Sequence, residues 1–273
     1  MDNFQLSSIV KGIHEKDGIC YSDSHSQISY PDEGNHDCMQ VEDNSFWFAH
    51  RNRCIISLVK HFSNEEVFWD IGGGNGFVAR GLQQNSIESV LVEPGIAGAL
   101  NARDRGIKNV ICSTLENIEL VPGAIKAAGM FDVIEHIEND VEFLSTVGKS
   151  MEPAGMVYIT VPAFKFIWSK DDDYAGHFRR YTIKSANKLM TDSGFEPFFS
   201  SYLFFPLPLP IFLLRSLPSI FGIKQKEENS AKNKREHTGS GIIHSLLERE
   251  YNLIRILKTV PFGSSCLVVG KKK

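Results

Sequence analysis

Short apolar segments and amphipathic segments alternate along most of this chain of 273 residues. Six apolar segments have the length of buried strands: residues 67–70, 90–93, 110–112, 124–131, 156–161 and 265–269. Four segments between them have the apolar spacing of helices: residues 77–84, 95–105, 140–149 and 183–193, the last followed by a helix-ending Gly194. This alternation predicts an α/β fold, in which a doubly wound parallel sheet carries helices on both faces.

The remaining segments differ in character. Residues 1–44 are polar with short apolar patches, so we expect irregular structure there, with a short helix near residues 4–13. Residues 45–62 and 241–258 have the apolar spacing of amphipathic helices. Residues 203–223 are apolar but contain four prolines, which exclude one straight helix and a membrane span. The charged residues 225–236 then predict a solvated loop.

Composition narrows the class of protein. The net charge of -4 and the pI of about 6.1 argue against a broad nucleic-acid surface. Five scattered cysteines without a C-x-x-C pair suit a reducing cytoplasm, and no signal peptide or transmembrane segment is evident. Cys20, His25, His36 and Cys38 fit no zinc-finger or zinc-ribbon spacing, so we expect no metal among them.

A run of glycines follows the first strand, in the segment VFWDIGGGNG. Asp70 ends the strand, and Gly72, Gly74 and Gly76 occupy alternate positions, with Gly73 as an extra glycine. Glycines at a sharp strand-to-helix turn accept positive φ and let backbone N–H groups approach a ligand. The spacing matches neither the dinucleotide pattern G-x-G-x-x-G nor the P-loop. It resembles motif I of the class I S-adenosylmethionine (SAM) methyltransferases, in which this turn contacts the amino-acid part of SAM.

The second strand also ends in an acid, Glu93, about 20 residues beyond the glycine turn. An acid at that position is placed to accept hydrogen bonds from ribose hydroxyls. The resemblance therefore implies that SAM contacts Asp70, the four glycines, Glu93 and Pro94. The loop after the third strand would flank the adenine, and an arginine of the preceding helix would pair with the SAM carboxylate. The residues expected in these two roles are Thr114, Leu115, Glu116, Arg51 and, as an alternative, Arg53.

Acids and histidines follow the fourth strand, where the methyl group is expected. FDVIEHIEND contains Asp132, Glu135 and His136, and the later GHFRRYT contributes His177. Three interpretations remain open. His136 or His177 acts as general base on an acceptor hydroxyl. The four side chains bind a divalent metal, as a similar acid-x-x-Glu-His arrangement in Hen-type RNA-end methyltransferases suggests. Alternatively, Glu135 and His136 cap a helix and pair with an arginine.

Two adjacent arginines and a tyrosine occur in GHFRRYT. Arg179 and Arg180 are suited to bidentate binding of a phosphate or carboxylate of the substrate, with Tyr181 beside them. They are equally suited to pairing with the acids at positions 171–173. Both interpretations stay open.

The order of DIGGGNG, VLVEP, FDVIEHIEND, GHFRRYT and PFGSSCLVVGKK resembles a family of bacterial class I methyltransferases known as type 11 or type 12. The resemblance covers about residues 46–271 and implies a seven-stranded Rossmann-like sheet. Lys126 replaces an acid found in many relatives, so we give it no role. The implied parts are a cap (1–62), a SAM-binding core (63–204), a helical insertion over the acceptor pocket (205–260), and a last strand with a basic tail (261–273).

The resemblance implies a cytoplasmic enzyme that transfers the SAM methyl group to an oxygen or carbon atom of a small sugar-, lipid- or quinone-like molecule. One alternative is a metal-assisted O-methyltransferase that uses Asp132, Glu135, His136 and His177. Another is a SAM-binding regulatory protein without turnover. The apolar insertion would suit a lipid-like acceptor, contact with a membrane surface or a homodimer interface. We expect a monomer or a homodimer and no nucleic-acid partner.

Overall fold

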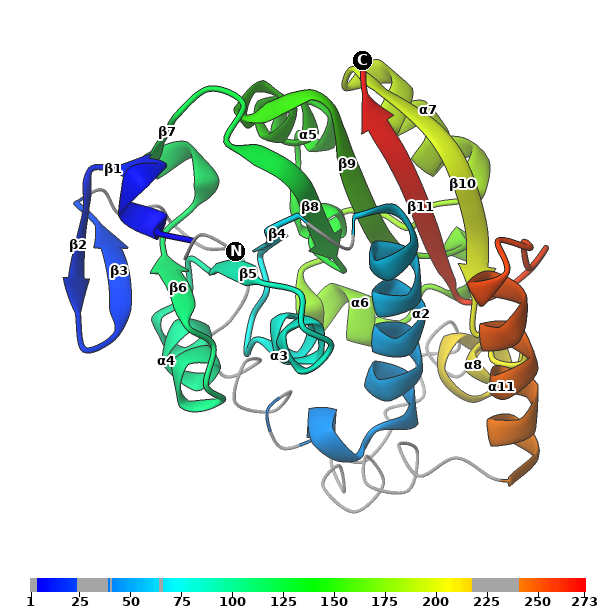
Figure 1. The fold of residues 1–273 in the computed structure, drawn as a ribbon. Helices are drawn as coiled ribbons and strands as arrows, with labels where there is room; N and C mark the ends of the chain where they lie inside the picture. The colour runs from blue at the N-terminus through cyan, green and yellow to red at the C-terminus, as the bar shows by residue number, and fades with distance from the viewer. Residues whose placement is uncertain (1–3, 24–38, 40, 64–65, 218–240) are drawn as a thin grey trace.

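The computed structural model describes residues 4–23, 39, 41–63, 66–217 and 241–273, and a mixed sheet runs through its centre (Figure 1). The nine strands lie in the order β10 (Phe195–Leu203), β11 (Ser265–Lys272), β9 (Met151–Pro162), β8 (Ile125–Phe131), β4 (Phe68–Ile71), β5 (Ser89–Val92), β6 (Asn109–Cys112), β3 (Ile19–Ser22) and β2 (Ile13–Lys16). Pairing is parallel from β3 to β9, whereas β11 is antiparallel to both its neighbours.

All six segments expected as strands are strands of this sheet, and β10 is the further strand of the seven-stranded core. The predicted doubly wound α/β fold is therefore confirmed. The last strand is longer than expected and continues to Lys272, so that Lys271 and Lys272 belong to β11 rather than to a tail.

The expectation of irregular structure in residues 1–44 is wrong for residues 13–22. Strands β2 and β3 form a hairpin there, and β3 extends the sheet by pairing with β6. Asp17 and Gly18 link the two strands with φ angles of +52° and +77°. This two-residue Asp-Gly turn is a strong hairpin signal in the sequence, because it requires positive φ at both positions. The short helix expected near residues 4–13 is limited to one 3₁₀ turn, η1 (Leu6–Ser8), which precedes the short strand β1 (Val10–Lys11). Strand β1 pairs with β7 (Glu119–Leu120) outside the main sheet.

Successive residues of the central strands enter opposite apolar layers. In β4, Trp69 and Ile71 belong to one buried cluster, whereas Phe68 belongs to another on the opposite face. The first cluster includes residues of α5 (Asp140–Ser150) and α7 (Ile183–Asp192). The second includes residues of α2 (Phe46–Phe62), α3 (Phe77–Gln84) and α11 (Gly241–Arg255), and α4 (Ile96–Asp104) packs nearby in a third cluster. Helices thus cover both faces of the sheet.

The two amphipathic helices outside the alternating region lie side by side (Figure 1). Helix α2 begins after Ser45, as expected, and α11 packs against it. A buried pair, His50 and Glu250, joins them at 2.7 Å, and an exposed pair joins Arg53 to Glu248 at 2.8 Å. Arg53, the alternative partner expected for the SAM carboxylate, is therefore paired with Glu248 of α11 in this structure.

The proline-rich segment forms no single straight helix within its described part. It contains α8 (Pro208–Ile211) and a π-helical turn, η6 (Phe212–Ser216). The predicted loop at 225–236 lies outside the described residues, and whether the insertion covers an acceptor pocket stays a prediction. None of the helices in the described ranges has the length and apolar character that a membrane span requires.

Candidate functional site

The residues expected to bind SAM follow strands that end at one edge of the sheet. Strands β8, β4, β5 and β6 are consecutive in the sheet and run parallel, so their carboxyl ends lie at the same edge. The loops after these strands contain the glycine turn, Glu93, Thr114 and Asp132. In open α/β sheets, ligands bind at this edge.

At position 72 of the glycine turn, only glycine fits the backbone conformation and the space. Its φ is +71°, and a Cβ atom there would lie 2.7 Å from Cγ2 of Val133. Gly76, with a φ of +76°, is the N-cap of α3. The turn therefore leads a buried strand directly into a helix N-terminus, as the motif predicted.

Glu93 joins this turn to the next one. Its Oε2 atom accepts a hydrogen bond from the Gly74 N–H at 2.9 Å, and its Oε1 atom accepts one from the Gly95 N–H at 2.8 Å. The carboxylate is buried, and this burial raises its pKa. Each carboxylate oxygen has a second lone pair, so these bonds leave acceptor capacity for ribose hydroxyls.

Asp70 lies at the carboxyl end of β4 and is only 1% exposed. Its Oδ2 atom has no hydrogen-bond partner among the described residues. Burial raises the pKa of this carboxyl to about 7. A buried acid with an unpartnered oxygen beside the glycine turn is a candidate for ligand contact.

The other residues expected near SAM take different positions. Leu115 is buried in the apolar cluster of the sheet, so most of its side chain packs against the protein. The Thr114 hydroxyl is buried and has no hydrogen-bond partner within the described ranges, whereas Glu116 is exposed. The Pro94 carbonyl lies 3.9 Å from the Cys112 thiol. Among Pro94, Thr114, Leu115 and Glu116, the Thr114 hydroxyl is therefore the best candidate for a hydrogen bond to a ligand.

Arg51 lies near the site but is paired within the protein. Its Nη1 atom donates to the Asp132 carboxylate, whose other oxygen accepts from the Thr160 hydroxyl at 2.9 Å. Asp132 itself has a φ of +58°, which is strained for a residue other than glycine. The predicted contact of Arg51 with a SAM carboxylate therefore requires a change in this ion pair or a second contact through its unpartnered Nε.

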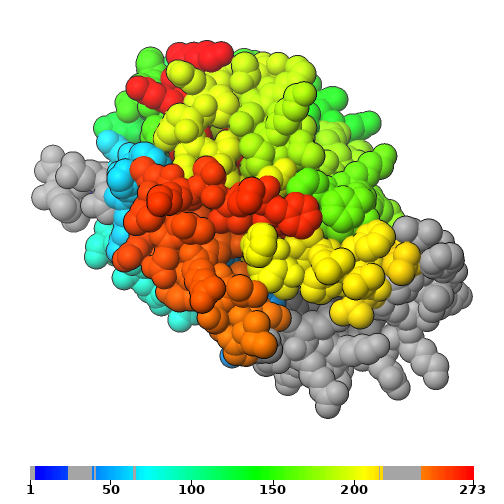
Figure 2. Space-filling view, turned by 90° about the vertical axis from the view of Figure 1, so that its right-hand side faces the viewer, coloured from blue at the N-terminus to red at the C-terminus, as the bar shows by residue number. Residues whose placement is uncertain are grey.

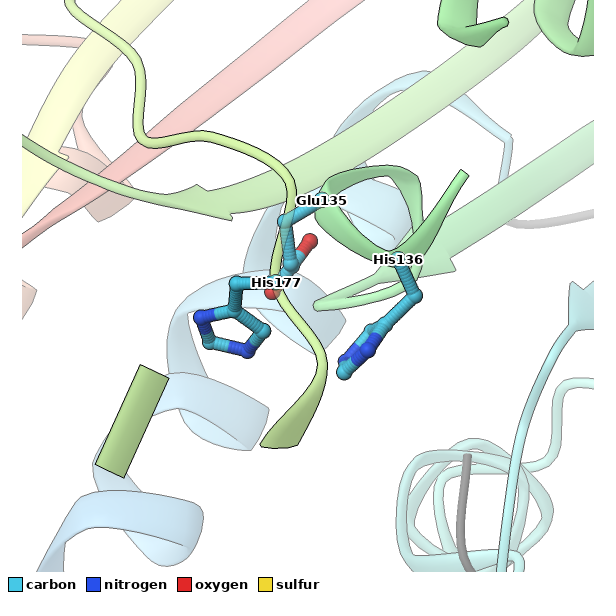
Figure 3. A group of neighbouring side chains, drawn as sticks. All are labelled: Glu135, His136 and His177. Carbon is cyan, nitrogen blue, oxygen red and sulfur yellow. The ribbon is translucent and has the colours of Figure 1, made fainter. Parts of the chain in front are cut away.

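Glu135, His136 and His177 form a group, called here the Glu–His–His cluster (Figure 3). One ligand atom of each residue lies within 4.8 Å of the others. Glu135 and His136 belong to the turn η4 (Ile134–His136) after β8, and His177 follows α6 (Lys170–Ala175). A backbone hydrogen bond of 2.8 Å from the Phe178 N–H to the Glu135 carbonyl holds the two segments together. Asp132 lies outside this group.

Burial sets the charge of the cluster. Burial and the nearby His177 lower the pKa of His136 to about 4, so its imidazole is neutral at physiological pH. Burial and the Asp132 charge raise the pKa of Glu135 well above its usual value. The two imidazole rings meet edge to face, with centroids 4.7 Å apart. The neutral His136 ring and the neighbouring side chains of Glu135 and His177 are therefore groups that could bind a cation.

Arg179, Arg180 and Tyr181 make internal contacts. Arg180 binds both oxygens of Asp172, at 2.7 and 3.0 Å, which is the alternative pairing that the sequence left open. Arg179 pairs with Asp140 at 2.8 Å, and the buried Tyr181 hydroxyl donates to the same carboxylate. Among the residues that the structure describes, no ion pair joins Glu135 to an arginine. Anion recognition by these three residues stays a prediction.

Two sets of contacts near the site were not predicted from the sequence: the pairing of His177 with Asp172, and a polar group under the glycine turn. Asp172 accepts a hydrogen bond from Nδ1 of His177 at 2.8 Å, and the contacts from His177 and Arg180 outweigh burial, so the pKa of Asp172 falls to about 2. Under the glycine turn, Asn75 donates to Glu42 at 3.3 Å and accepts from Asn101 at 2.8 Å. Arg105 pairs with Glu42 at 2.8 Å in a buried contact. The only local signal was an asparagine inside the glycine run.

Comparison with known proteins agrees with this geometry. The model of the methyltransferase domain family matches residues 47–198. No curated protein matches the sequence.

Among solved structures, a SAM-dependent methyltransferase of Thermotoga maritima, described as a possible histamine N-methyltransferase, is 19% identical with a TM-score of 0.55, over 88% of this chain and 95% of its own. Phosphoethanolamine N-methyltransferase 2 of Haemonchus contortus, in complex with SAM, is 17% identical with a TM-score of 0.53, over 90% of this chain and 58% of its own.

The [4+2]-cyclase SpnF is 13% identical with a TM-score of 0.52, over 96% of this chain and 86% of its own. These identities show a shared fold, and the cyclase illustrates that this fold supports more than one reaction. The family match covers more than half of the chain. This protein therefore belongs to the methyltransferase domain family and has the fold of the class I SAM-dependent methyltransferases.

Proposed function

We propose that this protein transfers the methyl group of SAM to an oxygen or carbon atom of a small molecule of sugar-, lipid- or quinone-like type. The observation that carries the proposal is that the glycine turn and the turn with Glu135 and His136 follow two neighbouring parallel strands, β4 and β8, at the carboxyl edge of the sheet. The first group would bind the methyl donor, and the second would serve the acceptor.

On the donor side, the Glu93 bonds to Gly74 and Gly95 support a preformed site. The glycine turn points the N-terminus of α3 towards the carboxyl edge, where it favours a negatively charged group such as the SAM carboxylate. The unpartnered oxygens of Asp70 and Thr114 are further candidates for SAM contacts.

On the acceptor side, His177 is the best-oriented base. The low pKa of Asp172 means that this acid is ionised and accepts the hydrogen bond, so Nδ1 of His177 carries the proton. In the neutral ring, Nε2 then has a free lone pair for an acceptor hydroxyl proton. Methyl transfer is an in-line displacement at the sulfonium, so the protein contributes mainly by positioning the acceptor and removing this proton.

Calorimetric titration with SAM and S-adenosylhomocysteine tests the donor site. Glu93→Ala removes the acceptor of two backbone N–H groups and should weaken SAM binding about 10- to 100-fold. Glu88→Ala is the matched control, because Glu88 comes directly before strand β5 whereas Glu93 comes directly after it, and Glu88 accepts a hydrogen bond from Asn109 instead of the glycine turn. Equal SAM affinity in both variants, or no SAM binding by the wild type, would refute the proposed site.

Methyl transfer itself is tested with SAM labelled at the methyl carbon and pooled small-molecule acceptors of the three types. Label should appear in a small-molecule product with the wild type and at least 10-fold more slowly with His177→Ala, because general base catalysis contributes about 10²- to 10⁴-fold. Tight SAM binding without any transfer would favour the alternative, a regulatory protein that binds SAM without turnover.

A further inference from the structure

The Glu–His–His cluster has the composition and spacing of a metal site. A carboxylate and two imidazoles converge on one region in Figure 3, and their ligand atoms lie within 4.8 Å of one another. Ligand atoms around one ion such as Zn²⁺ lie roughly 3 to 3.5 Å apart, because each is about 2.0–2.2 Å from the ion. A small adjustment of side chains would therefore close the cluster on a cation.

Glu135 is the second observation that points to a cation. The residue is 1% exposed, and its Oε2 atom has no hydrogen-bond partner among the described residues. A buried polar oxygen without a partner is costly, and a buried carboxylate more so. A cation bound between Glu135 and the imidazoles would supply the missing contact.

Both imidazole rings donate a hydrogen bond to a residue of helix α6. Asp172 accepts the His177 Nδ1–H at 2.8 Å, and the Ala175 carbonyl accepts a hydrogen bond from the His136 ring. Asp172 is itself fixed by the Ser169 N–H at 2.8 Å and by Arg180. Histidines that bind metals usually donate their other N–H to a carboxylate or a backbone carbonyl in this way, which fixes the tautomer and the orientation of the ring.

We propose that Glu135, His136 and His177 bind one divalent transition-metal ion of the Zn²⁺ or Mn²⁺ class. Two imidazoles favour such ions over Mg²⁺ and Ca²⁺, which prefer oxygen ligands. Three protein ligands leave a coordination position for an acceptor oxygen. Resting on the proposed function, this assignment makes the histidines ligands rather than the free base, and the cation would ease the loss of the acceptor hydroxyl proton.

The test is metal binding by the full chain after removal of metal with EDTA. Calorimetric titration with Zn²⁺, Mn²⁺ and Mg²⁺ should show one site for Zn²⁺, with Mg²⁺ at least 10-fold weaker. Glu135→Gln and His177→Ala should each weaken Zn²⁺ binding at least 10-fold. Asp172→Asn, a change at a positioning residue, should weaken it about 10- to 100-fold. His61→Ala, an exposed histidine of α2, is the control and should bind as the wild type does.

Several outcomes would overturn the metal site: no Zn²⁺ site in the wild type, or unchanged binding in Glu135→Gln and His177→Ala, as expected if cysteines bound the ion. If Glu135→Gln does not fold, Zn²⁺ binding by His177→Ala and His136→Ala, which change more accessible residues, tests the metal site. SAM is titrated into the same samples. SAM binding without Zn²⁺ binding would overturn the metal site alone, whereas Zn²⁺ binding without SAM binding would overturn the proposed function alone.

Discussion

At Gly72, backbone conformation and crowding together exclude a side chain. Its φ is +71°, and an added Cβ would lie 2.7 Å from Val133, whereas Gly12 has a φ of +69° with nothing within 4 Å of that position. Gly12→Ala should therefore lower the free energy of unfolding by about 1–2 kcal/mol, through conformational strain alone. Gly72→Ala should lower the free energy of unfolding by about 1–3 kcal/mol more, through crowding, and should weaken SAM binding. Urea denaturation of both variants measures the difference; equal losses would contradict the crowding argument.

Asp70 predicts a dependence of stability on pH. Its pKa is about 7 in the folded protein, above the usual aspartate value of 3.8, so the fold favours the protonated form. The unfolded chain loses this proton first, and the contribution of Asp70 to stability therefore falls as pH rises from about 4 to about 7. The loss is on the order of 4 kcal/mol over that window.

The measurement is the free energy of unfolding without SAM at several pH values. Because Glu135 and Glu93 also have raised pKa values, the informative quantity is the difference between the wild type and Asp70→Asn. This substitution should flatten the decline between pH 4 and pH 7. Asp104→Asn, at an exposed position, serves as the control. A decline of the same size in Asp70→Asn would show that Asp70 is not its source.

The site contacts that could be predicted from the sequence join residues that lie close together along the chain. Glu93 and the glycine turn follow consecutive strands, so their relation is encoded within one βαβ unit. The Arg180–Asp172 pair was among the alternatives because only eight positions separate the two residues. The partner of Arg51 was missed, because Asp132 is 81 positions away and its place depends on how α2 packs over β8.

At the scale of elements, the docking of α11 on α2 depends on one buried acid. Glu250 accepts hydrogen bonds from His50 and from the backbone N–H groups of Phe204 and Phe205, each at 2.7 Å. Glu250→Ala leaves the buried His50 ring and Phe204 N–H, and the partly buried Phe205 N–H, without this acceptor, and should cost about 3–5 kcal/mol of unfolding free energy. Urea denaturation monitored by circular dichroism measures this loss.

Glu248 provides the matched comparison, because it pairs with Arg53 between the same two helices but is half exposed. Glu248→Ala should cost at most about 1 kcal/mol, since exposed ion pairs are screened by water and salt. Similar losses in the two variants would mean that burial of Glu250 does not set the strength of the contact. The sequence predicted both helices but not this pair, whose members are 200 positions apart.

Across the whole molecule, one apolar cluster connects the insertion to the sheet. It contains Leu58 of α2, Phe68 of β4, Leu203 of β10, Leu247 of α11 and Leu267 of β11, all nearly inaccessible to solvent. Because these elements share one core, we expect a single cooperative unfolding transition. Tryptophan emission and far-ultraviolet circular dichroism should therefore give the same midpoint in urea. Two separated transitions would show that α11 unfolds independently.

SAM should shift this transition as a whole. A ligand that binds only the folded state at 100 times its dissociation constant adds about 2.7 kcal/mol to the free energy of unfolding. Both spectroscopic signals should move equally, because the site and the insertion share the same core. A shift confined to one signal would contradict this coupling.

The position of β11 has a consequence for the order of events during synthesis on the ribosome. This strand inserts between β9 and β10, although residues 265–272 are made long after β10 ends at Leu203. At about 5–20 residues per second, the nascent chain waits about 3–12 s between the two strands. Throughout that interval the edges of β9 and β10 that later pair with β11 are unpaired, and unpaired strand edges can form hydrogen bonds with other chains. Newly made molecules should therefore depend on chaperones until the last strand emerges.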